Sequence, residues 1–278
     1  MVLYRLTSVR SLARFLIEQP EIVRACEFKS ERIPSYRTLC RRFGCLDNWI
    51  LEWCRVIITA LLEARIVKLK TLIIDGTPGQ SKCKRPKGEV MTRPSDPEAG
   101  FGTTNWGKEW FFGYKAVILA TAEPLIIPLS WQVIPANKQE VNYLIPVVSK
   151  AAWLIEAGKK YELVADCGFD AQYNYDWCQK LNIRFTCPLN QGNEIKGQRI
   201  KRQKFYKSKG GQKLYQRRTD IERLNGQLKE LFLIDPFTVK RLKNVITYLN
   251  LAMLCYLAAV YYNFTEGRGL REIKSLIA

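Results

Sequence analysis

Three carboxylates in this sequence stand where side chains of that type can bind a metal ion. Asp75 and Asp166 each close a short run of apolar residues, and Glu222 lies in a segment with helical spacing. Mg²⁺ prefers oxygen ligands, and two such ions can flank the attacking and leaving oxygens of a phosphoryl group. This chemistry requires no nucleophilic side chain. The three residues are therefore candidate catalytic residues and metal ligands, provided that the fold brings them together.

The sequence contains no histidine, which narrows the chemistry further. Ser-His-Asp triads, imidazole general bases and histidine-ligated zinc are excluded, so carboxylates are the natural agents of any hydrolysis. The nine cysteines form no Cys-x2-Cys pair, and the N-terminal residues have the pattern of an amphipathic helix rather than a signal peptide. We therefore expect reduced thiols and a cytoplasmic protein.

The balance of charges indicates a polyanionic partner. The 278 residues include 44 Lys and Arg against 26 Asp and Glu, a formal net charge of +18. A compact protein with such a charge otherwise suffers self-repulsion without gain, so nucleic acid is the first candidate and an anionic membrane surface the second. The apolar segment 245–264 is almost long enough to cross a membrane, but Asn250 interrupts it and no second span accompanies it. We expect it to be a helix buried under a sheet, and we expect no membrane partner.

The segment 214–232, which contains Glu222, has the periodicity of a single helix. One face is apolar and is formed by Ile221, Leu224, Leu228 and Leu231. A second face is polar and is formed by Tyr215, Arg218, Glu222 and Lys229. At about 100° per residue these four side chains project within an arc of about 60°, so a substrate along this face would meet all of them. The alternative is a solvated charged face on which Arg218 and Glu222 form a surface ion pair.

The elements that must position the carboxylates follow from the apolar runs. A buried strand is expected at 69–74, ending at Asp75 in a turn, and a long loop from Pro78 to Glu109 follows. Next come a hairpin, a helix, a strand, a helix and a strand, at 111–121 and 125–134, 139–157, 161–165, 171–181 and 183–189. Three antiparallel strands joined to two parallel ones, with helices on both faces, describe an α/β fold of the ribonuclease H-like class with a mixed five-stranded sheet.

Residues 1–66 are expected to form a separate N-terminal helical region, ahead of a ribonuclease H-like domain at 67–278. Helices are predicted at 11–18, 36–43 and 49–64. The second of these ends at Gly44 and turns Arg37, Arg41 and Arg42 outward. It is either half of a DNA-binding helix-turn-helix or a bundle helix with a basic exterior, because the apolar spacing serves both.

Two basic segments accompany the candidate carboxylates. Residues 196–218 contain ten Lys or Arg among 23 residues, no acidic residue and three interspersed aromatic residues. This composition suits phosphate binding with some base stacking, and it makes Lys201, Arg202 and Lys204 candidate DNA contacts. The loop from Pro78 to Glu109 carries Lys82, Lys84, Arg85, Lys87 and Arg93. We expect both segments to order against a polyanion, and solvated basic loops are the alternative.

The sequence around the three carboxylates resembles that of the DDE transposases of bacterial insertion sequences. Asp75 in IIDGT, Asp166 in VADCGFD and Glu222 in IERLNGQLKE match the three catalytic positions, with 90 residues between the first two and 55 between the second and third. The helix also carries the subgroup signature Tyr-x2-Arg-x3-Glu-x6-Lys without a mismatch, as Tyr215, Arg218, Glu222 and Lys229. The likeness covers most of the chain, including the helical N-terminal part.

The resemblance implies a reaction, a cofactor and partners. Asp75, Asp166 and Glu222 would ligate two Mg²⁺ ions, with Mn²⁺ as a substitute, while Tyr215, Arg218 and Lys229 would contact phosphates near the transposon end. Nicking of double-stranded DNA at the element's ends and strand transfer into target DNA, in a homodimer and on the nucleoid, are the expected activities. The alternatives are an inactive DNA-binding regulator derived from a transposase and a structure-selective nuclease of the same fold.

Overall fold

The computed structural model describes residues 1–28, 33–83, 95–104, 107–122, 124–190 and 196–277. The chain forms two compact units, which we describe separately. Unit 1 comprises Met1–Ile57, Gln80–Ala99 and Leu228–Ala278, and unit 2 comprises Ile58–Gly79 and Gly100–Gln227. The predicted domain boundary between residues 66 and 67 cuts the chain once, whereas each compact unit combines segments from different parts of the chain. The predicted boundary stays a prediction.

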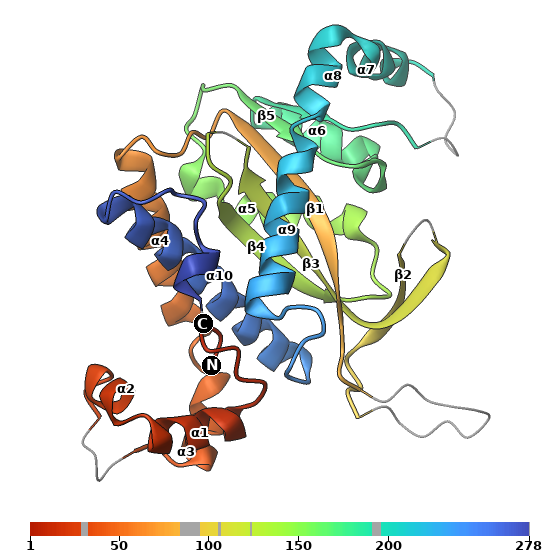
Figure 1. Ribbon diagram of the computed structural model, residues 1–278. Coiled ribbons are helices and arrows are strands. Elements are labelled where there is room, and N and C mark those ends of the chain that lie inside the picture. Colours follow the sequence, from red (N-terminus) through yellow and green to blue (C-terminus); the bar gives the residue numbers. More distant parts are fainter. Residues whose placement is uncertain (29–32, 84–94, 105–106, 123, 191–195, 278) are drawn as a thin grey trace, which may run out of the picture. The chain divides into compact units, whose positions relative to one another are not determined.

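Unit 2 is built on a six-stranded mixed sheet (Figure 1). Its strands are β1 Thr71–Gln80, β2 Gly100–Thr104, β3 Glu109–Thr121, β4 Pro128–Pro135, β5 Tyr161–Val164 and β6 Ile183–Thr186. Their order is β2-β3-β1-β5-β6, and β4 also pairs with β3. β3 is antiparallel to β2 and β4, whereas β5 is parallel to β1 and β6. The predicted ribonuclease H-like mixed sheet is confirmed, with β2 as an additional strand that the sequence pattern did not reveal.

The prediction that the first strand ends at Asp75 is wrong, because β1 continues to Gln80. The Asp-Gly-Thr-Pro sequence is typical of a turn, but Gly76 serves a different purpose here. A Cβ atom on Gly76 would lie 2.1 Å from Oε2 of Glu140, so glycine is needed for a close approach within an extended strand. The predicted loop 78–109 likewise contains the end of β1 and all of β2. Lys84, Arg85, Lys87 and Arg93 of that loop lie outside the described residues.

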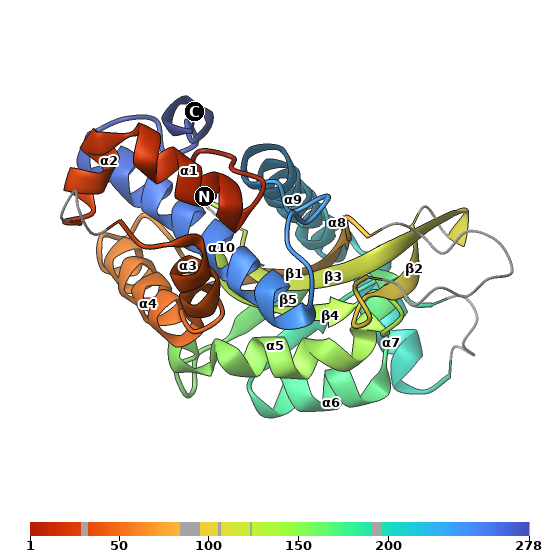
Figure 2. The same ribbon diagram turned by 90° about the horizontal axis from the view of Figure 1, so that it is seen from below.

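Helices cover both faces of this sheet. The predicted helix 139–157 is present as η3 Glu140–Tyr143, α5 Leu144–Lys150 and η4 Ala152–Leu154, and η5 Cys167–Phe169 and α6 Gln172–Lys180 follow β5. α5 and α6 lie on one face of the sheet and α9 Arg218–Phe232 crosses the other (Figures 1 and 2). The predicted apolar face of α9 is buried, with Ile221, Leu224 and Leu228 completely inaccessible to solvent. Burial of this face determines which way the polar face of α9 points.

The basic segment before α9 is helical and is not a loop. It forms α7 Gln198–Lys207 and α8 Lys209–Tyr215, which meet at a sharp corner. Ser208 caps α8 by accepting a hydrogen bond from the Gly211 N–H at 3.1 Å. A Cβ atom on Gly211 would lie 2.0 Å from the carbonyl oxygen of Phe205, so only glycine allows the two helices to approach this closely.

The single helix predicted for 214–232 is wrong, because α8 and α9 are separated at Gln216 and Arg217. Here the backbone hydrogen bonds tighten from four-residue to three-residue spacing. The Arg217 N–H donates to the Leu214 carbonyl at 3.1 Å, and the Thr219 N–H donates to the Gln216 carbonyl at 3.2 Å. The two helices are therefore joined by a short 3₁₀-type turn, which places Tyr215 on a different helix from Arg218.

Unit 1 contains helices from both ends of the chain. They are α1 Val9–Glu18, α2 Pro20–Ala25, α3 Tyr36–Phe43, the start of α4 Asp47–Glu63, α10 Leu242–Thr265 and the short η6 Lys274–Leu276. Ser8 and Ser35 cap α1 and α3 by accepting hydrogen bonds from the N–H groups of Ser11 and Thr38. Among the described residues α10 alone has the length and composition of a membrane span, and 61% of its most apolar window is buried. A largely buried helix of this kind is also typical of a protein core.

Candidate active site

Asp75 lies in the middle of β1 and is only 6% exposed. One carboxylate oxygen, Oδ2, accepts a hydrogen bond from the side-chain amide of Asn225 at 3.3 Å, and the other lies 3.8 Å from Nη2 of Arg218. Burial raises the pKa of Asp75 to about 7; Arg218 opposes this effect, while Asp166 and Glu140 add to it. A carboxyl with this pKa is about half protonated at neutral pH, whereas an ordinary aspartate is fully ionised there.

Asp166 directly follows Ala165 at the carboxyl end of β5. Its Oδ1 accepts a hydrogen bond from the Gly168 N–H at 2.9 Å and so caps the short helix η5. This local contact fixes the side chain at the edge of the parallel part of the sheet, as the sequence predicts. Its charge is close enough to raise the pKa of Asp75, which places the two aspartates in one electrostatic environment.

Glu222 lies one turn inside α9, and its Oε1 lies 2.9 Å from Nη1 of Arg218. The same guanidinium contacts Asp75, so Arg218 bridges a carboxylate of the sheet and a carboxylate of the helix. Burial opposes the positive charge of Arg218, but neighbours that include Asp75, Asp166 and Glu222 outweigh it and raise the pKa of Arg218. All three candidate carboxylates therefore act on one cation.

The donor set suits a metal ion chemically, since carboxylate oxygens are the ligands that Mg²⁺ prefers. Within the part of the chain that the structure describes, however, no three acidic or thiol side chains are grouped closely enough to hold one ion together. The guanidinium of Arg218 lies between the carboxylates of Asp75 and Glu222 and supplies the positive charge there. Residues of the right type thus meet around a cation contributed by the protein itself.

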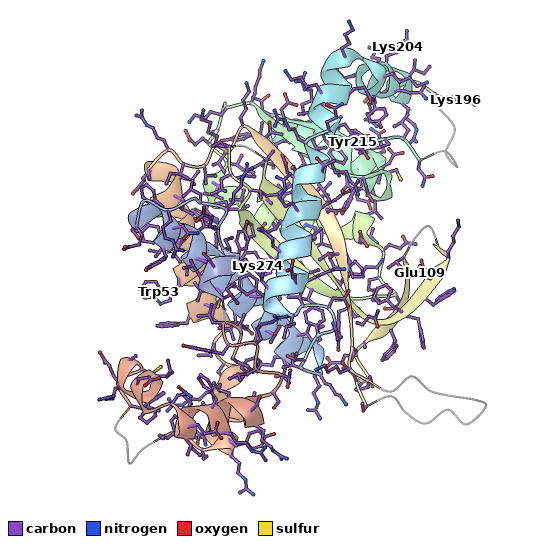
Figure 3. The ribbon with its side chains drawn as sticks, in the orientation of Figure 1. Trp53, Glu109, Lys196, Lys204, Tyr215 and Lys274 are labelled. Carbon is purple, nitrogen blue, oxygen red and sulfur yellow. The ribbon has the colours of Figure 1, made fainter. Side chains whose placement is uncertain are left out.

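Tyr215 and Lys229 stand before and after this centre along the chain. Tyr215 ends α8 (Figure 3), and its ring packs edge-on against Tyr206 with centroids 5.2 Å apart. Burial raises the pKa of Tyr215, with Arg218 opposing and Asp166 contributing, which shows that the tyrosine shares the electrostatic environment of the carboxylates. Lys229 lies two turns beyond Glu222 on α9, and its Nζ is 3.2 Å from Oδ2 of Asp235.

The basic residues of α7 divide into two kinds. Lys201 and Lys204 are exposed, and Figure 3 shows Lys204 on a helix that projects away from the sheet. Arg202 instead turns toward α6, where its guanidinium stacks on the ring of Tyr175 at 3.6 Å and donates to Gln172 at 3.0 Å. Lysines therefore provide the solvent-facing charge of this helix, and arginine anchors it.

A second arginine anchors α7 more deeply. Nη2 of Arg199 lies 2.7 Å from Oδ2 of Asp170, whose side chain is fully buried and also accepts a hydrogen bond from the Asn190 N–H at 2.8 Å. Such a desolvated pair is costly to break, because the remaining charge stays buried. The basic helices are thus fixed to the body of unit 2.

The remaining candidates, Arg41 and Arg42, lie in unit 1. They occupy the last turn of α3, where both side chains are exposed. Basic residues at this end of a helix are favoured by its dipole, which accounts for their presence without a ligand. Their role in DNA binding stays a prediction.

Sequence reasoning missed two polar residues beside Asp75. Glu140 places its carboxylate against Gly76 and pairs with Nζ of Lys115 at 3.0 Å, and both side chains are largely buried. No local signal identifies Glu140, because the contact joins segments far apart in the sequence. Asn225 donates to Asp75, and its position three residues after Glu222, on neighbouring helix positions, is a signal that could have found it.

Comparisons with known proteins relate this chain to one protein family. A family model described as "Transposase DDE domain" matches residues 68–258, more than half of the chain. No curated protein matches the sequence.

Two solved structures are similar in part. A piggyBac transposase in a synaptic complex with hairpin DNA shows 10% identity and a TM-score of 0.47, covering 84% of this chain and 56% of that one. A Mos1 protein in a pre-cleavage transpososome shows 9% identity and a TM-score of 0.26, covering 98% of this chain and 79% of that one. Both scores are too low to identify a function.

Proposed function

Because the chain belongs to the transposase DDE domain family, we propose that it cleaves DNA at the ends of a mobile element and transfers the freed strand to target DNA. The signature Tyr215, Arg218, Glu222 and Lys229 points to an enzyme of the bacterial insertion-sequence type. Double-stranded DNA is the substrate, a homodimer that synapses two ends is the working form, and the cytoplasm, on the nucleoid, is the expected place of action.

One observation carries the proposal. Asp75 and Glu222, which are remote in the chain, meet on a single guanidinium, and Asp166 lies near enough to influence both that cation and Asp75. Ordinary folding energetics do not favour a buried carboxyl beside a second acidic residue and within the electrostatic influence of a third, since like charges repel and a buried carboxyl loses hydration. Acidic residues that share one cation in this way are typical of a site that binds cations and phosphates.

The residues have different roles in the proposed reaction. Asp75, Asp166 and Glu222 would hold two Mg²⁺ ions, which would activate the attacking oxygen and stabilise charge on the leaving oxygen of the phosphodiester. Arg218 and Tyr215 lie beside the carboxylates and bind phosphate oxygens of the DNA strand there. The exposed lysines of α7, such as Lys201 and Lys204, contact the DNA backbone further out.

Cleavage assays with DNA that carries the element's ends test this proposal. In the presence of Mg²⁺, Asp75→Ala, Asp166→Ala and Glu222→Gln abolish cleavage and strand transfer, whereas DNA binding persists. Glu230→Gln is the matched control, because Glu230 lies on the same helix but pairs with Lys274 instead of Arg218. Full activity in any of the three variants would reject the assignment, and cleavage without joined products would identify a nuclease.

A second function is favoured by one feature of the site. Arg218 already neutralises two of the carboxylates, and no joint ligand group exists among the described residues. An inactive DNA-binding regulator would look the same. Salt-dependent DNA binding without cleavage at any Mg²⁺ or Mn²⁺ concentration would establish this alternative.

A further inference from the structure

Unit 1 contains a cavity of about 490 Å³ that the proposed reaction does not use. It lies where the start of α1, the side of α3 and the segment before α10 meet. Its main polar lining consists of Arg10, Tyr36, Ser95, Thr238, Lys240 and Arg241. A cavity of this size lies within the range of small-ligand sites.

The charge of this lining has one sign. Arg10, Lys240 and Arg241 contribute three cations, and among the described residues no acidic side chain lines the cavity. The cations are held by neutral partners: Arg10 lies over the ring of Tyr36 at 5.2 Å, and Nζ of Lys240 donates to the Ser95 hydroxyl at 2.7 Å. Among the described residues neither of these two side chains is paired with a carboxylate, whereas the Asp96 carboxylate accepts the backbone N–H of Arg241, so the cavity attracts anions mainly through Arg10 and Lys240.

The N-terminus of α1 adds to the positive electrostatic potential of the cavity. Ser8, Val9 and Arg10 of the lining are the cap and first two residues of α1, whose first turn contains no acidic residue. Positive charge at a helix N-terminus is normally unfavourable, and Arg10 at this position adds its charge to the positive end of the helix dipole, which an anion would offset. The start of α10 contributes less, because Asp96 and Glu98 already accept the N–H groups of Arg241 and Leu242.

The Thr238 hydroxyl belongs to a residue of the same lining and is only weakly hydrogen-bonded. Its Oγ1 is inaccessible to solvent and makes no hydrogen bond within the usual limits of distance and angle, although the neighbouring Tyr248 hydroxyl interacts with it. The Tyr248 hydroxyl donates to the Phe232 carbonyl at 2.9 Å. Buried polar groups are normally satisfied, so the hydrogen-bonding capacity of Thr238 is not fully used.

The wall that carries these groups includes a residue with a strained backbone. Arg241 holds a left-handed conformation at φ 73°, which is unusual for a residue with a side chain. The fully buried Asp96 holds this strained residue in place, because it accepts both the Arg241 N–H at 3.0 Å and the Ser81 hydroxyl at 2.8 Å. Strain that the surrounding structure maintains is a frequent mark of ligand-binding positions.

We propose that this cavity binds a phosphate group. Three cations, several hydroxyls and a helix N-terminus are the groups that recognise phosphate oxygens. The phosphate belongs either to a DNA strand, with the cavity as an anchor for unit 1, or to a small phosphorylated molecule. The site is separate from the carboxylate cluster, so its test is independent of the proposed transposase activity.

The experiment uses the full chain and two probes, inorganic phosphate and a short DNA duplex. Calorimetry measures phosphate binding against sodium chloride of equal ionic strength, and fluorescence anisotropy measures DNA binding over a range of salt concentrations. The test variants are Arg10→Ala and Lys240→Ala. Their matched controls are Arg14→Ala on α1 and Lys243→Ala on α10, which remove the same charges outside the lining of the cavity.

Each test variant weakens binding of its probe by about tenfold, since each removes a charge-assisted hydrogen bond, and the controls change it by about twofold or less. If the phosphate belongs to DNA, each variant also lowers the steepness of the salt dependence. The slope of the logarithm of the DNA-binding constant against the logarithm of salt concentration then falls in magnitude by about one. If only inorganic phosphate binding falls, the ligand is a small phosphorylated molecule. Equal effects of test and control variants on both probes overturn the proposal.

Thr238→Val separates a true site from general electrostatics. This substitution keeps the shape and the net charge but removes the buried hydroxyl of a residue that lines the cavity. It lowers phosphate affinity several-fold while leaving the thermal stability of the free protein unchanged or higher, because an unsatisfied buried hydroxyl is lost. Unchanged affinity for both probes in a folded Thr238→Val protein would also count against the site.

Discussion

Replacing Asp75 by asparagine should stabilise the protein at neutral pH, although Asp75 is a central candidate for catalysis. The carboxyl is almost completely buried and its pKa is raised to about 7, mainly by desolvation. An asparagine side chain has nearly the same shape, and its oxygen can still accept the hydrogen bond from Asn225. The substitution therefore removes the buried charge and little else.

The size and sign of the effect follow from proton linkage. In the unfolded chain Asp75 ionises with its ordinary pKa of 3.8, whereas in the folded protein the pKa is about 7. Between these values the folded state holds a proton that the unfolded state has released, so stability is lost as pH rises from about 4 to about 7. The complete loss of folding free energy is roughly 4 kcal/mol, and more than half of it falls between about pH 5 and pH 8. The attraction of Arg218 is already included in the pKa.

Urea denaturation in the presence of a chelator measures this effect. The free energy of unfolding of the wild type, relative to Asp75→Asn, should fall by roughly 2–3 kcal/mol between about pH 5 and pH 8. Asp176→Asn is the control, because Asp176 is an exposed residue on α6 and should show no such trend. Added Mg²⁺ should narrow the difference at pH 8, since a cation stabilises the ionised form of Asp75.

The reasoning is refuted if the difference between wild type and Asp75→Asn is the same at every pH. That result would mean that water or the neighbouring cations solvate the carboxylate of Asp75 well enough to keep its pKa normal. A wild type that is more stable than Asp75→Asn at pH 8 would contradict it more strongly.

Three further substitutions probe the framework of the site by urea denaturation. Gly76→Ala should lower the free energy of unfolding by about 1–3 kcal/mol, because its Cβ would meet the Glu140 carboxylate. Adding Glu140→Ala should recover much of this stability. An equal loss of stability in the double variant would exclude that clash. Asp170→Ala should cost about 3–5 kcal/mol by leaving Arg199 without its buried partner, and a loss below about 1 kcal/mol would show that water reaches the pair. Gly211→Ala should cost at least about 2 kcal/mol and expose the α7–α8 corner to proteolysis, since its Cβ would overlap backbone; unchanged cleavage would count against that corner as described.

The existence of most elements could be predicted from the sequence, because their causes are local. The hairpin of β3 and β4 and the strand β5 are apolar runs bounded by turn residues. α3 has the predicted bounds, since Ser35 caps its start and Gly44 follows its end. In each case neighbouring residues alone determine the backbone.

Predictions failed where a distant contact determines the local structure. The Asp-Gly-Thr-Pro sequence around Gly76 is typical of a turn, yet Gly76 lies within β1, with the Glu140 carboxylate against its Cα position. The stacking of the Arg202 guanidinium on Tyr175 of α6 is a distant contact of the same kind, and the DNA contact expected of Arg202 stays a prediction. The break after Tyr215 interrupts a run of good helix formers, so helix propensity could not reveal it.

The candidate site was predicted in a different way. The selection of Asp75, Asp166 and Glu222 depended on spacing shared with a family, because no rule of composition places a strand residue beside a helix residue so far away in the chain. The contacts of Arg218 supply the physical link between two of them. Which ions and which DNA they bind stays a prediction.

The position of Arg218 has a consequence for how the protein is made. A cleft of bare negative charges would resist closure until an ion arrived, and folding would then depend on the metal supply of the cell. Here Arg218 of the same polypeptide supplies positive charge beside Asp75 and Glu222. We therefore expect the chain to fold without an added ion, and chelation during purification should leave the protein intact.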